Sequence, residues 1–173
     1  LLIVAILIKL EDGGPIFYSQ FRTGLYGKQI NIVKFRSMKV DAEKNGPQWA
    51  SKSDKRITII GSIIRVSRVD ELPQLLSVLK GEMSLIGPRP ERREIEEFLF
   101  NEIPLLEMKN WIKPGLSGWA QVNYPYGASV QDSEMKLSYD LFYLKNYSLW
   151  LDLLIFFKTL RLVLNRKGAI PKY

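Results

Sequence analysis

The sequence predicts an α+β fold that is mainly helical and contains one small β-hairpin. Residues 16–36 hold two strand-like segments around a glycine-containing turn. Pro73 predicts a helix over residues 70–79, because proline is tolerated in a first helical turn, and Gly81 would end it. Residues 149–164 form a strongly apolar run of helical length. A chain of 173 residues is long enough for one domain with a real core.

The first ten residues are almost entirely apolar, and the turn-forming run Glu11-Asp12-Gly13-Gly14-Pro15 follows them. They are too few to span a membrane, which takes about 20 residues. They also lack the basic start and the cleavage site of a signal peptide. We expect them to be the tail of a longer hydrophobic segment that lies upstream. A buried core strand is the alternative.

The hairpin is expected to pair residues 16–22 with residues 29–36 across the turn at 23–28. Side chains alternate along a strand, so Lys34 and Arg36 would project side by side from one face. Two neighbouring cations can bind phosphate. From the spacing alone, a solvated hairpin edge is the favoured interpretation.

The following polar segment, residues 39–56, is expected to be a mobile surface loop. A short apolar stretch then leads to the adjacent carboxylates Asp70 and Glu71. Asp70 would lie at the N-cap or in the first turn of the helix, at the positive end of its dipole. It could cap the helix or serve catalysis. Glu71 would lie roughly 100° further round the helix.

Three further segments carry local signals. Residues 91–107 are charged and predict a solvated amphipathic helix, and residues 114–119 and 124–127 predict tight turns. In the apolar run 149–164, charged residues interrupt the sequence and disfavour a spanning helix. That run therefore predicts either a helix lying in a membrane interface or a core helix.

Composition limits the chemistry. The chain contains no Cys and no His, which excludes disulfides, thiol nucleophiles and zinc-thiolate sites and removes the commonest general base. Any metal would be bound by oxygen, so Mg²⁺, or else Mn²⁺, is favoured over zinc. The net charge of +7 points to an anionic partner, such as nucleic acid, anionic lipid or a phosphorylated substrate.

Five motifs in order resemble the bacterial sugar transferase family, the monotopic polyprenyl-phosphate phosphoglycosyl transferases, and within it the branch that initiates exopolysaccharide or O-antigen repeat units. The motifs are Lys34-Phe35-Arg36-Ser37-Met38, Asp70-Glu71-Leu72-Pro73-Gln74-Leu75, Gly87-Pro88-Arg89-Pro90, Lys113-Pro114-Gly115-Leu116-Ser117-Gly118-Trp119-Ala120-Gln121-Val122-Asn123 and Tyr139-Asp140-Leu141-Phe142-Tyr143-Leu144-Lys145-Asn146.

The resemblance implies transfer of a sugar-1-phosphate, expected to be a hexose phosphate, from a UDP-sugar to undecaprenyl phosphate with release of UMP. It implies a covalent intermediate on Asp70, with Glu71 beside it. The other matching functional positions, expected to bind substrate phosphate, are Lys34, Arg65, Arg89 and Asp140. Read locally, Asp140 would be a helix-surface carboxylate paired with Lys136 or Lys145.

The resemblance also implies Mg²⁺, with Mn²⁺ as the alternative, at Asp70 and Glu71. It implies an N-terminal re-entrant membrane helix, of which residues 1–12 would be the second arm, a catalytic domain over residues 13–173 and interfacial amphipathic helices. The expected location is the cytoplasmic face of the bacterial cytoplasmic membrane, in contact with anionic lipid, with a homodimer as a plausible assembly. A nucleic-acid-binding module, which no base-reading motif supports, and a catalytically silent scaffold are the alternatives.

Overall fold

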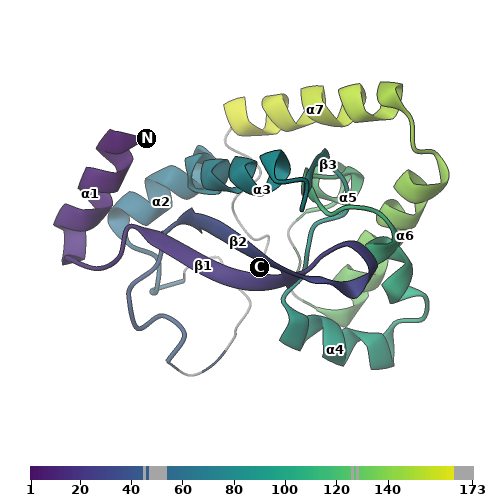
Figure 1. The fold of residues 1–173 in the computed structure, drawn as a ribbon, viewed down its shortest axis with the longest axis horizontal. Helices are drawn as coiled ribbons and strands as arrows, with labels where there is room; N and C mark the ends of the chain where they lie inside the picture. Colours follow the sequence, from purple (N-terminus) through teal and green to yellow (C-terminus); the bar gives the residue numbers. More distant parts are fainter. Residues whose placement is uncertain (45, 47–53, 126, 128, 166–173) are drawn as a thin grey trace.

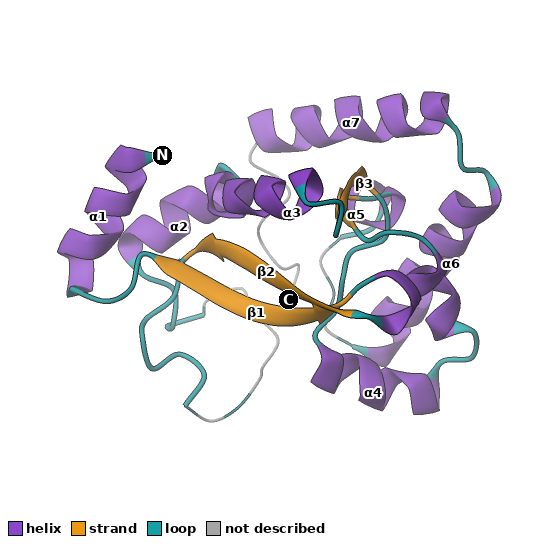
Figure 2. Cartoon of the chain, in the orientation of Figure 1, coloured by secondary structure: helices purple, strands orange, loops and turns teal. Residues whose placement is uncertain are grey.

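The structure is a computed structural model that describes residues 1–44, 46, 54–125, 127 and 129–165. Helices surround a central two-stranded hairpin (Figures 1 and 2). The mainly helical α+β prediction is therefore confirmed. The hairpin lies between α1, α2, α3 and α7 on one side and α4 on the other (Figure 1).

The first element is the helix α1 (Leu2–Asp12), so the alternative of a core strand is wrong. Only Ile8 is buried, where it packs against Phe35 and Ile64. Leu2 and Leu10 are exposed. The helix ends at Gly13, whose φ of 72° needs glycine, and the Gly13 N–H donates to the carbonyl of Lys9.

Two carboxylates at the end of α1 fix it to the rest of the chain. Glu11 Oε1 accepts hydrogen bonds from the N–H groups of Ile59 and Ile60, in the first turn of α2 (Ile59–Val66). Asp12 forms a two-oxygen ion pair with Arg36 at 2.5 and 2.6 Å. The orientation of α1 is therefore set by charged contacts as well as by the packing of Ile8.

The predicted hairpin is confirmed. β1 (Phe17–Thr23) pairs antiparallel with β2 (Gln29–Phe35), and η1 (Leu25–Gly27) joins them. The solvated-edge interpretation of its two cations is wrong. Lys34 is half-buried, and Arg36 is buried after the end of β2, where it donates to Asp12 and to the carbonyl of Pro15.

The loop predicted over residues 39–56 is closed at its base, where the Lys39 N–H donates to the carbonyl of Arg56. Residues 45 and 47–53 of that loop prediction lie outside the described residues. The apolar stretch that follows forms α2, and the Thr58 hydroxyl caps it by accepting from Gly61 N–H.

The helix predicted over residues 70–79 is present, but its first part is a 3₁₀ helix. η2 (Val69–Gln74) leads into α3 (Leu75–Leu79), and Gly81 takes a left-handed φ of 76° after it. Because a 3₁₀ helix has about three residues per turn, Glu71 lies roughly 120° from Asp70, not 100°.

The tight turn predicted at residues 114–119 is wrong. β4 (Gly115–Ser117) pairs in parallel with β3 (Ser84–Ile86), and α5 (Trp119–Asn123) follows at once. A Cβ on Gly115 would lie 2.1 Å from Gly87 N, so glycine permits this close backbone approach. The turn predicted at 124–127 includes Tyr126, which lies outside the described residues.

The segment predicted as one solvated helix, residues 91–107, folds differently. It forms α4 (Arg93–Glu102) and runs into η3 (Leu106–Trp111), and both pack on α6 (Val130–Lys145) through a core of Leu99, Ile103, Leu106 and Leu137. Glu96 is buried and pairs with Lys109 at 3.1 Å. One face of this charged segment is therefore core, which the solvated-helix prediction missed.

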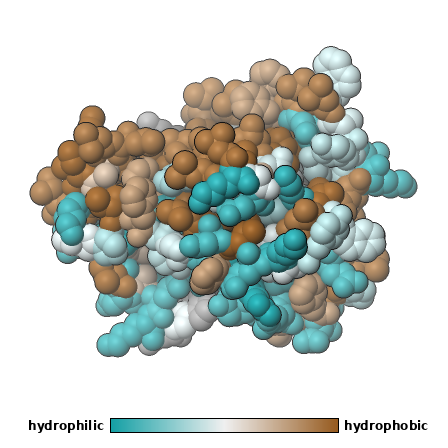
Figure 3. All heavy atoms as spheres, viewed as in Figure 1, coloured by the Kyte–Doolittle hydropathy of each residue, from teal (hydrophilic) through white to brown (hydrophobic). Residues whose placement is uncertain are grey.

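The last described helix is α7 (Leu149–Leu164), as the apolar run predicts. Only Ile155 is buried along it, whereas Trp150 is 81% exposed and Phe157 63% exposed, so the core-helix alternative is wrong. Figure 3 shows hydrophobic residues gathered over α1, α2, α3 and α7 along one side of the molecule. Among the described residues, no helix combines the length and apolarity needed to cross a bilayer.

Candidate active site

The predicted site residues come together. One cavity of about 380 Å³ is lined by side chains from β2, α2, η2, the loop after β3, and α6. It contains every residue that the motifs single out for chemistry: Lys34, Arg65, Asp70, Glu71, Arg89 and Asp140. Their roles stay predictions, but their convergence from distant parts of the chain is a property of the fold.

Asp70 is a buried carboxylate with one unsatisfied oxygen among the described residues. η2 begins after Arg68, whose left-handed φ of 57° turns the chain sharply, and Asp70 follows in its first turn. The side chain is buried, and its Oδ1 has no hydrogen-bond partner in the part of the chain that the structure describes. Burial, together with the neighbouring charge of Glu71, raises the pKa of Asp70 to about 6. Asp70 is thus a weakly solvated carboxylate that is ionised at neutral pH.

Glu71 has the opposite environment. Its Oε1 accepts from Arg89 at 2.5 Å, and its Oε2 accepts from Arg68 at 3.3 Å. Burial alone would raise the pKa of Glu71, but the charges of Arg89 and Arg68 and the Arg89 hydrogen bond outweigh it and lower the pKa to about 2. Glu71 is therefore always ionised and anchors two arginines.

Cationic side chains line the cavity around Asp70 and Glu71. Burial, with the charges of Arg22 and Arg89, lowers the pKa of Lys34 to about 8. Arg65 also lines the cavity and acts electrostatically on Asp70. These cations face an internal cavity rather than an open surface, which suits a small phosphorylated ligand better than a nucleic-acid duplex.

Asp140 is not the surface carboxylate that local reading predicts. It is buried on α6, and its Oδ1 has no partner. Burial raises the pKa of Asp140 to about 7; Lys109 and Lys136 oppose this shift, and Glu91 adds to it. The surface prediction for Asp140 is wrong because α4 and η3 pack on α6. Contacts between elements so far apart along the chain cannot be predicted from the spacing of residues within one helix.

Several cavity residues were not predicted from the sequence, among them Arg22, Arg68, Arg92, Gln121 and Lys136. The inward direction of Arg22 could have been predicted from side-chain alternation along the strand. Along β1 the more buried residues alternate, so Tyr18, Gln20 and Arg22 share the inner face. The Arg22 guanidinium donates to the Pro90 carbonyl at 3.3 Å and thereby supports the loop that carries Arg89.

Unsatisfied polar atoms gather in this cavity. Buried polar groups in folded proteins nearly always have partners, so each exception needs a cause. Among the described side chains, six buried N or O atoms lack one, and five of the six belong to residues that line this cavity: Arg22 Nε, Asp70 Oδ1, Arg92 Nη1, Gln121 Oε1 and Asp140 Oδ1. These residues therefore carry hydrogen-bonding atoms that the described part of the chain leaves unsatisfied, as expected of a site for a polar ligand.

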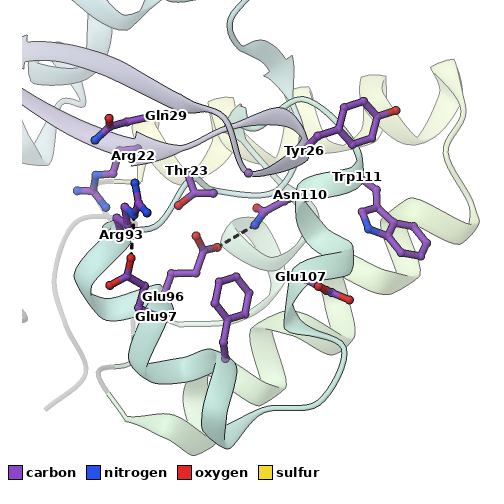
Figure 4. A pocket seen from close by; sticks show the side chains of 12 residues that line it. Arg22, Thr23, Tyr26, Gln29, Arg93, Glu96, Glu97, Glu107, Asn110 and Trp111 are labelled. Atoms are coloured by element: carbon purple, nitrogen blue, oxygen red, sulfur yellow. Dashed lines mark hydrogen bonds and ion pairs between the residues drawn. The ribbon is translucent and has the colours of Figure 1, made fainter.

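A second cavity of about 410 Å³ lies beyond Arg22, between the hairpin end, α4 and η3 (Figure 4). Its main charges are already satisfied: Glu96 accepts from Lys109 and Asn110, and Arg93 pairs with Glu97 at 2.8 Å. Its lining includes neither Asp70 nor Asp140. The cavity that contains Asp70 and Glu71 is therefore the candidate active site.

Comparison with known proteins identifies the family of this chain. The family described as bacterial sugar transferase matches residues 1–166. The chain is 48% identical to a UDP-N-acetylgalactosamine-undecaprenyl-phosphate N-acetylgalactosaminephosphotransferase of Aeromonas hydrophila, over 98% of this chain and 40% of the relative. It is 41% identical to a UDP-glucose:undecaprenyl-phosphate glucose-1-phosphate transferase of Xanthomonas campestris pv. campestris, over 98% of this chain and 36% of the relative.

A third relative, a putative undecaprenyl-phosphate N-acetylgalactosaminyl 1-phosphate transferase of Bacillus subtilis, is 57% identical over 59% of this chain and 57% of its own length. The chain thus spans between about a third and three fifths of these relatives. The family match covers nearly all of it, with the carboxylate pair and its arginines inside the matched region. The chain belongs to the bacterial sugar transferase family.

Proposed function

We propose that this chain transfers a sugar-1-phosphate from a UDP-sugar to undecaprenyl phosphate, releases UMP, and forms a covalent intermediate on Asp70. The observation that carries the proposal is the buried Asp70 carboxylate, which has an unpartnered oxygen in a cavity walled by cations. A structural carboxylate in such a place would be paired, as Glu71 is. The names of the relatives support the same overall reaction.

In the first displacement, a carboxylate oxygen of Asp70 forms a bond to the phosphorus that bears the sugar. The bond between that phosphorus and the bridging pyrophosphate oxygen breaks, and its electron pair leaves with UMP. In the second, a phosphate oxygen of undecaprenyl phosphate attacks the same phosphorus. The bond to Asp70 then breaks and the carboxylate is restored. No proton need be moved in either step, which suits a site without histidine.

The cations make these displacements possible, because a carboxylate must approach an already anionic phosphorus centre. Arg65 and Lys34 act on Asp70 electrostatically, and Arg89 is held by Glu71 at the same wall. Guanidinium groups can grip phosphate oxygens in a bidentate manner. Fixed charges of this kind stabilise developing negative charge without reorganising during the reaction.

The residues fit an oxygen-bound divalent cation such as Mg²⁺. Asp70 offers an unpartnered oxygen, whereas Glu71 already accepts from two arginines and would contribute only its remaining lone pairs. The described residues contain no group of three or more acidic, His or Cys side chains, so pyrophosphate and water oxygens would complete the coordination. When bound, the cation would neutralise pyrophosphate charge.

We place the apolar side formed by α1, α2, α3 and α7 against the cytoplasmic face of the bacterial membrane. Leu76, Leu79 and Phe157 are among its exposed residues. η2, which carries Asp70, continues directly into α3 on this side (Figure 1). A lipid phosphate at headgroup level would then lie near the nucleophile.

The test is to incubate the purified protein with Mg²⁺ and a panel of UDP-sugars, without lipid, and to measure intact mass and UMP release. The panel contains UDP-hexoses and UDP-N-acetylhexosamines, since the relatives' names include both. An added sugar-phosphate mass that disappears on addition of undecaprenyl phosphate supports the proposal. Lipid-dependent product formation with no adduct at any time would overturn the covalent route.

A further inference from the structure

Gln121, on α5, carries one of the unpartnered atoms of the cavity. Its Nε2 lies 3.5 Å from the carbonyl oxygen of Leu116, and its Oε1 is buried without a partner. The Leu116 carbonyl can only accept, so the NH₂ end of the amide must face it. The other end of the amide, the oxygen Oε1, is therefore a hydrogen-bond acceptor.

The element that carries Gln121 is held firmly by its neighbours. The Trp119 ring stacks on Phe142 of α6 with centroids 5.8 Å apart. On the other side, Lys158 of α7 lies 4.5 Å above the Trp119 ring and donates to Asn123 at 2.6 Å. Gln121 takes no part in these contacts. Its free oxygen therefore lies on a fixed element instead of a loose one.

Among the described residues, a second unpartnered oxygen comes from the neighbouring helix, α6. Asp140 Oδ1 belongs to α6, which packs against α5, and the Tyr124 and Tyr139 rings lie 6.1 Å apart where the two segments meet. The α5–α6 side of the cavity thus carries two such oxygens, of which Gln121 Oε1 is an acceptor whatever the pH. Unpartnered donor atoms, Arg22 Nε and Arg92 Nη1, belong to other residues that line the cavity.

The two proposed substrates differ in what they can offer these atoms. Both carry phosphate oxygens, so the arginine donors do not discriminate between them. An acceptor needs an N–H or O–H from its ligand. The ionised phosphate ester of a polyprenol has neither, whereas a UDP-sugar has hydroxyls on the sugar and ribose and one N–H on uracil.

We infer that Gln121 Oε1 accepts a hydrogen bond from a hydroxyl or N–H group of the nucleotide sugar, and that the α5–α6 side of the cavity is the subsite for the non-phosphate part of that substrate. This rests on the proposed function. The inference assigns Gln121 to the binding of the UDP-sugar. The phosphates of that substrate would bind to the cationic residues near Asp70.

The test is calorimetric binding in an Asp70→Asn background, where no turnover interferes, with UDP-sugars, UMP and undecaprenyl phosphate as ligands. Gln121→Met removes the acceptor at similar length and should weaken UDP-sugar binding about 5- to 10-fold. If UMP binding weakens equally, the donor is in uridine; if UMP binding is unchanged, the donor is a hydroxyl or an acetamido N–H of the sugar. Gln131→Met, at an exposed position of α6, is the matched control and should change neither affinity.

Unchanged UDP-sugar affinity in folded Gln121→Met would overturn the inference, and so would a loss confined to undecaprenyl phosphate. Failure of both the Asp70→Asn parent and the unmutated protein to bind any UDP-sugar would instead overturn the proposed function. Deoxy analogues provide a check that does not depend on the variant's folding. One missing hydroxyl, or a methylated uracil N–H, should weaken binding to the parent by the same factor as Gln121→Met.

Discussion

Arg89 donates a hydrogen bond to Glu71 across 2.5 Å and thereby ties the loop after β3 to η2. Arg68 engages the second oxygen of the same carboxylate at 3.3 Å. The two adjacent carboxylates therefore have different environments. The pKa of Glu71 is lowered to about 2, whereas the pKa of Asp70 is raised to about 6. Glu71 organises the cations, and Asp70 is left with an unpartnered oxygen.

Asp70→Asn should abolish both UMP release and the covalent adduct, because an amide cannot form the acyl phosphate. Intact mass after incubation with UDP-sugar and Mg²⁺ measures the adduct directly. Glu94→Gln, at an exposed position on α4, is the control and should keep both signals. Turnover by Asp70→Asn at the wild-type rate would rule out Asp70 as the nucleophile.

The Glu71–Arg89 pair should show strong coupling in a double-mutant cycle of unfolding free energy. The Glu71 carboxylate is buried, whereas the Arg89 side chain is 37% exposed. Removing Arg89 leaves the buried charge paired, among the described residues, with Arg68 alone, so the cycle of Glu71→Gln, Arg89→Gln and the double variant should give a coupling of about 1–3 kcal/mol. Chemical denaturation measures it.

The chain supplies a matched control pair. Arg93 and Glu97 lie 2.8 Å apart on α4, but their side chains are 63% and 61% exposed. Their coupling should stay below about 0.5 kcal/mol. Equal coupling in the two cycles would show that burial does not strengthen the Glu71–Arg89 contact.

Asp140→Asn should stabilise the fold, and the gain should grow with pH. The pKa of Asp140 is raised to about 7 from an ordinary 3.8, so its neutral form contributes stability that is complete below pH 3.8 and is lost as the pH rises through about 7. The gain at pH 8 should be on the order of a few kcal/mol. Thermal unfolding at pH 5 and pH 8 measures it; the same gain at both values would contradict the burial of an ionisable group.

Replacing exposed aromatic residues of α7 should weaken membrane binding. Trp150→Ser with Phe157→Ser removes large apolar surface that is 81% and 63% exposed, and the partition into anionic vesicles should fall at least tenfold. Vesicle flotation measures it. Phe98→Ser is the control, since Phe98 is 52% exposed but lies on α4, away from the apolar side (Figure 1). Equal losses in both variants would show that α7 has no special role.

Much of the local structure follows from the sequence. The hairpin, the helix after Arg68 and the apolar helix at residues 149–164 depend on turn residues, proline position and side-chain periodicity, which are properties of neighbouring residues. The motifs also single out six residues that the structure brings to one cavity. Pro114-Gly115 predicts a turn, but the chain forms a strand there by pairing with Ser84–Ile86. The prediction failed because this partner strand is distant in sequence.

The amino-acid sequence by itself determined which chemistry is available: carboxylates, lysines and arginines without histidine or cysteine. Only the tertiary structure decided which of those groups are paired. Glu71 is neutralised by Arg89, whereas Asp70, Gln121 and Asp140 keep unpartnered oxygens. The reason is physical: burial and pairing depend on distances between side chains from separate elements, and those distances exist only once the helices pack around the hairpin.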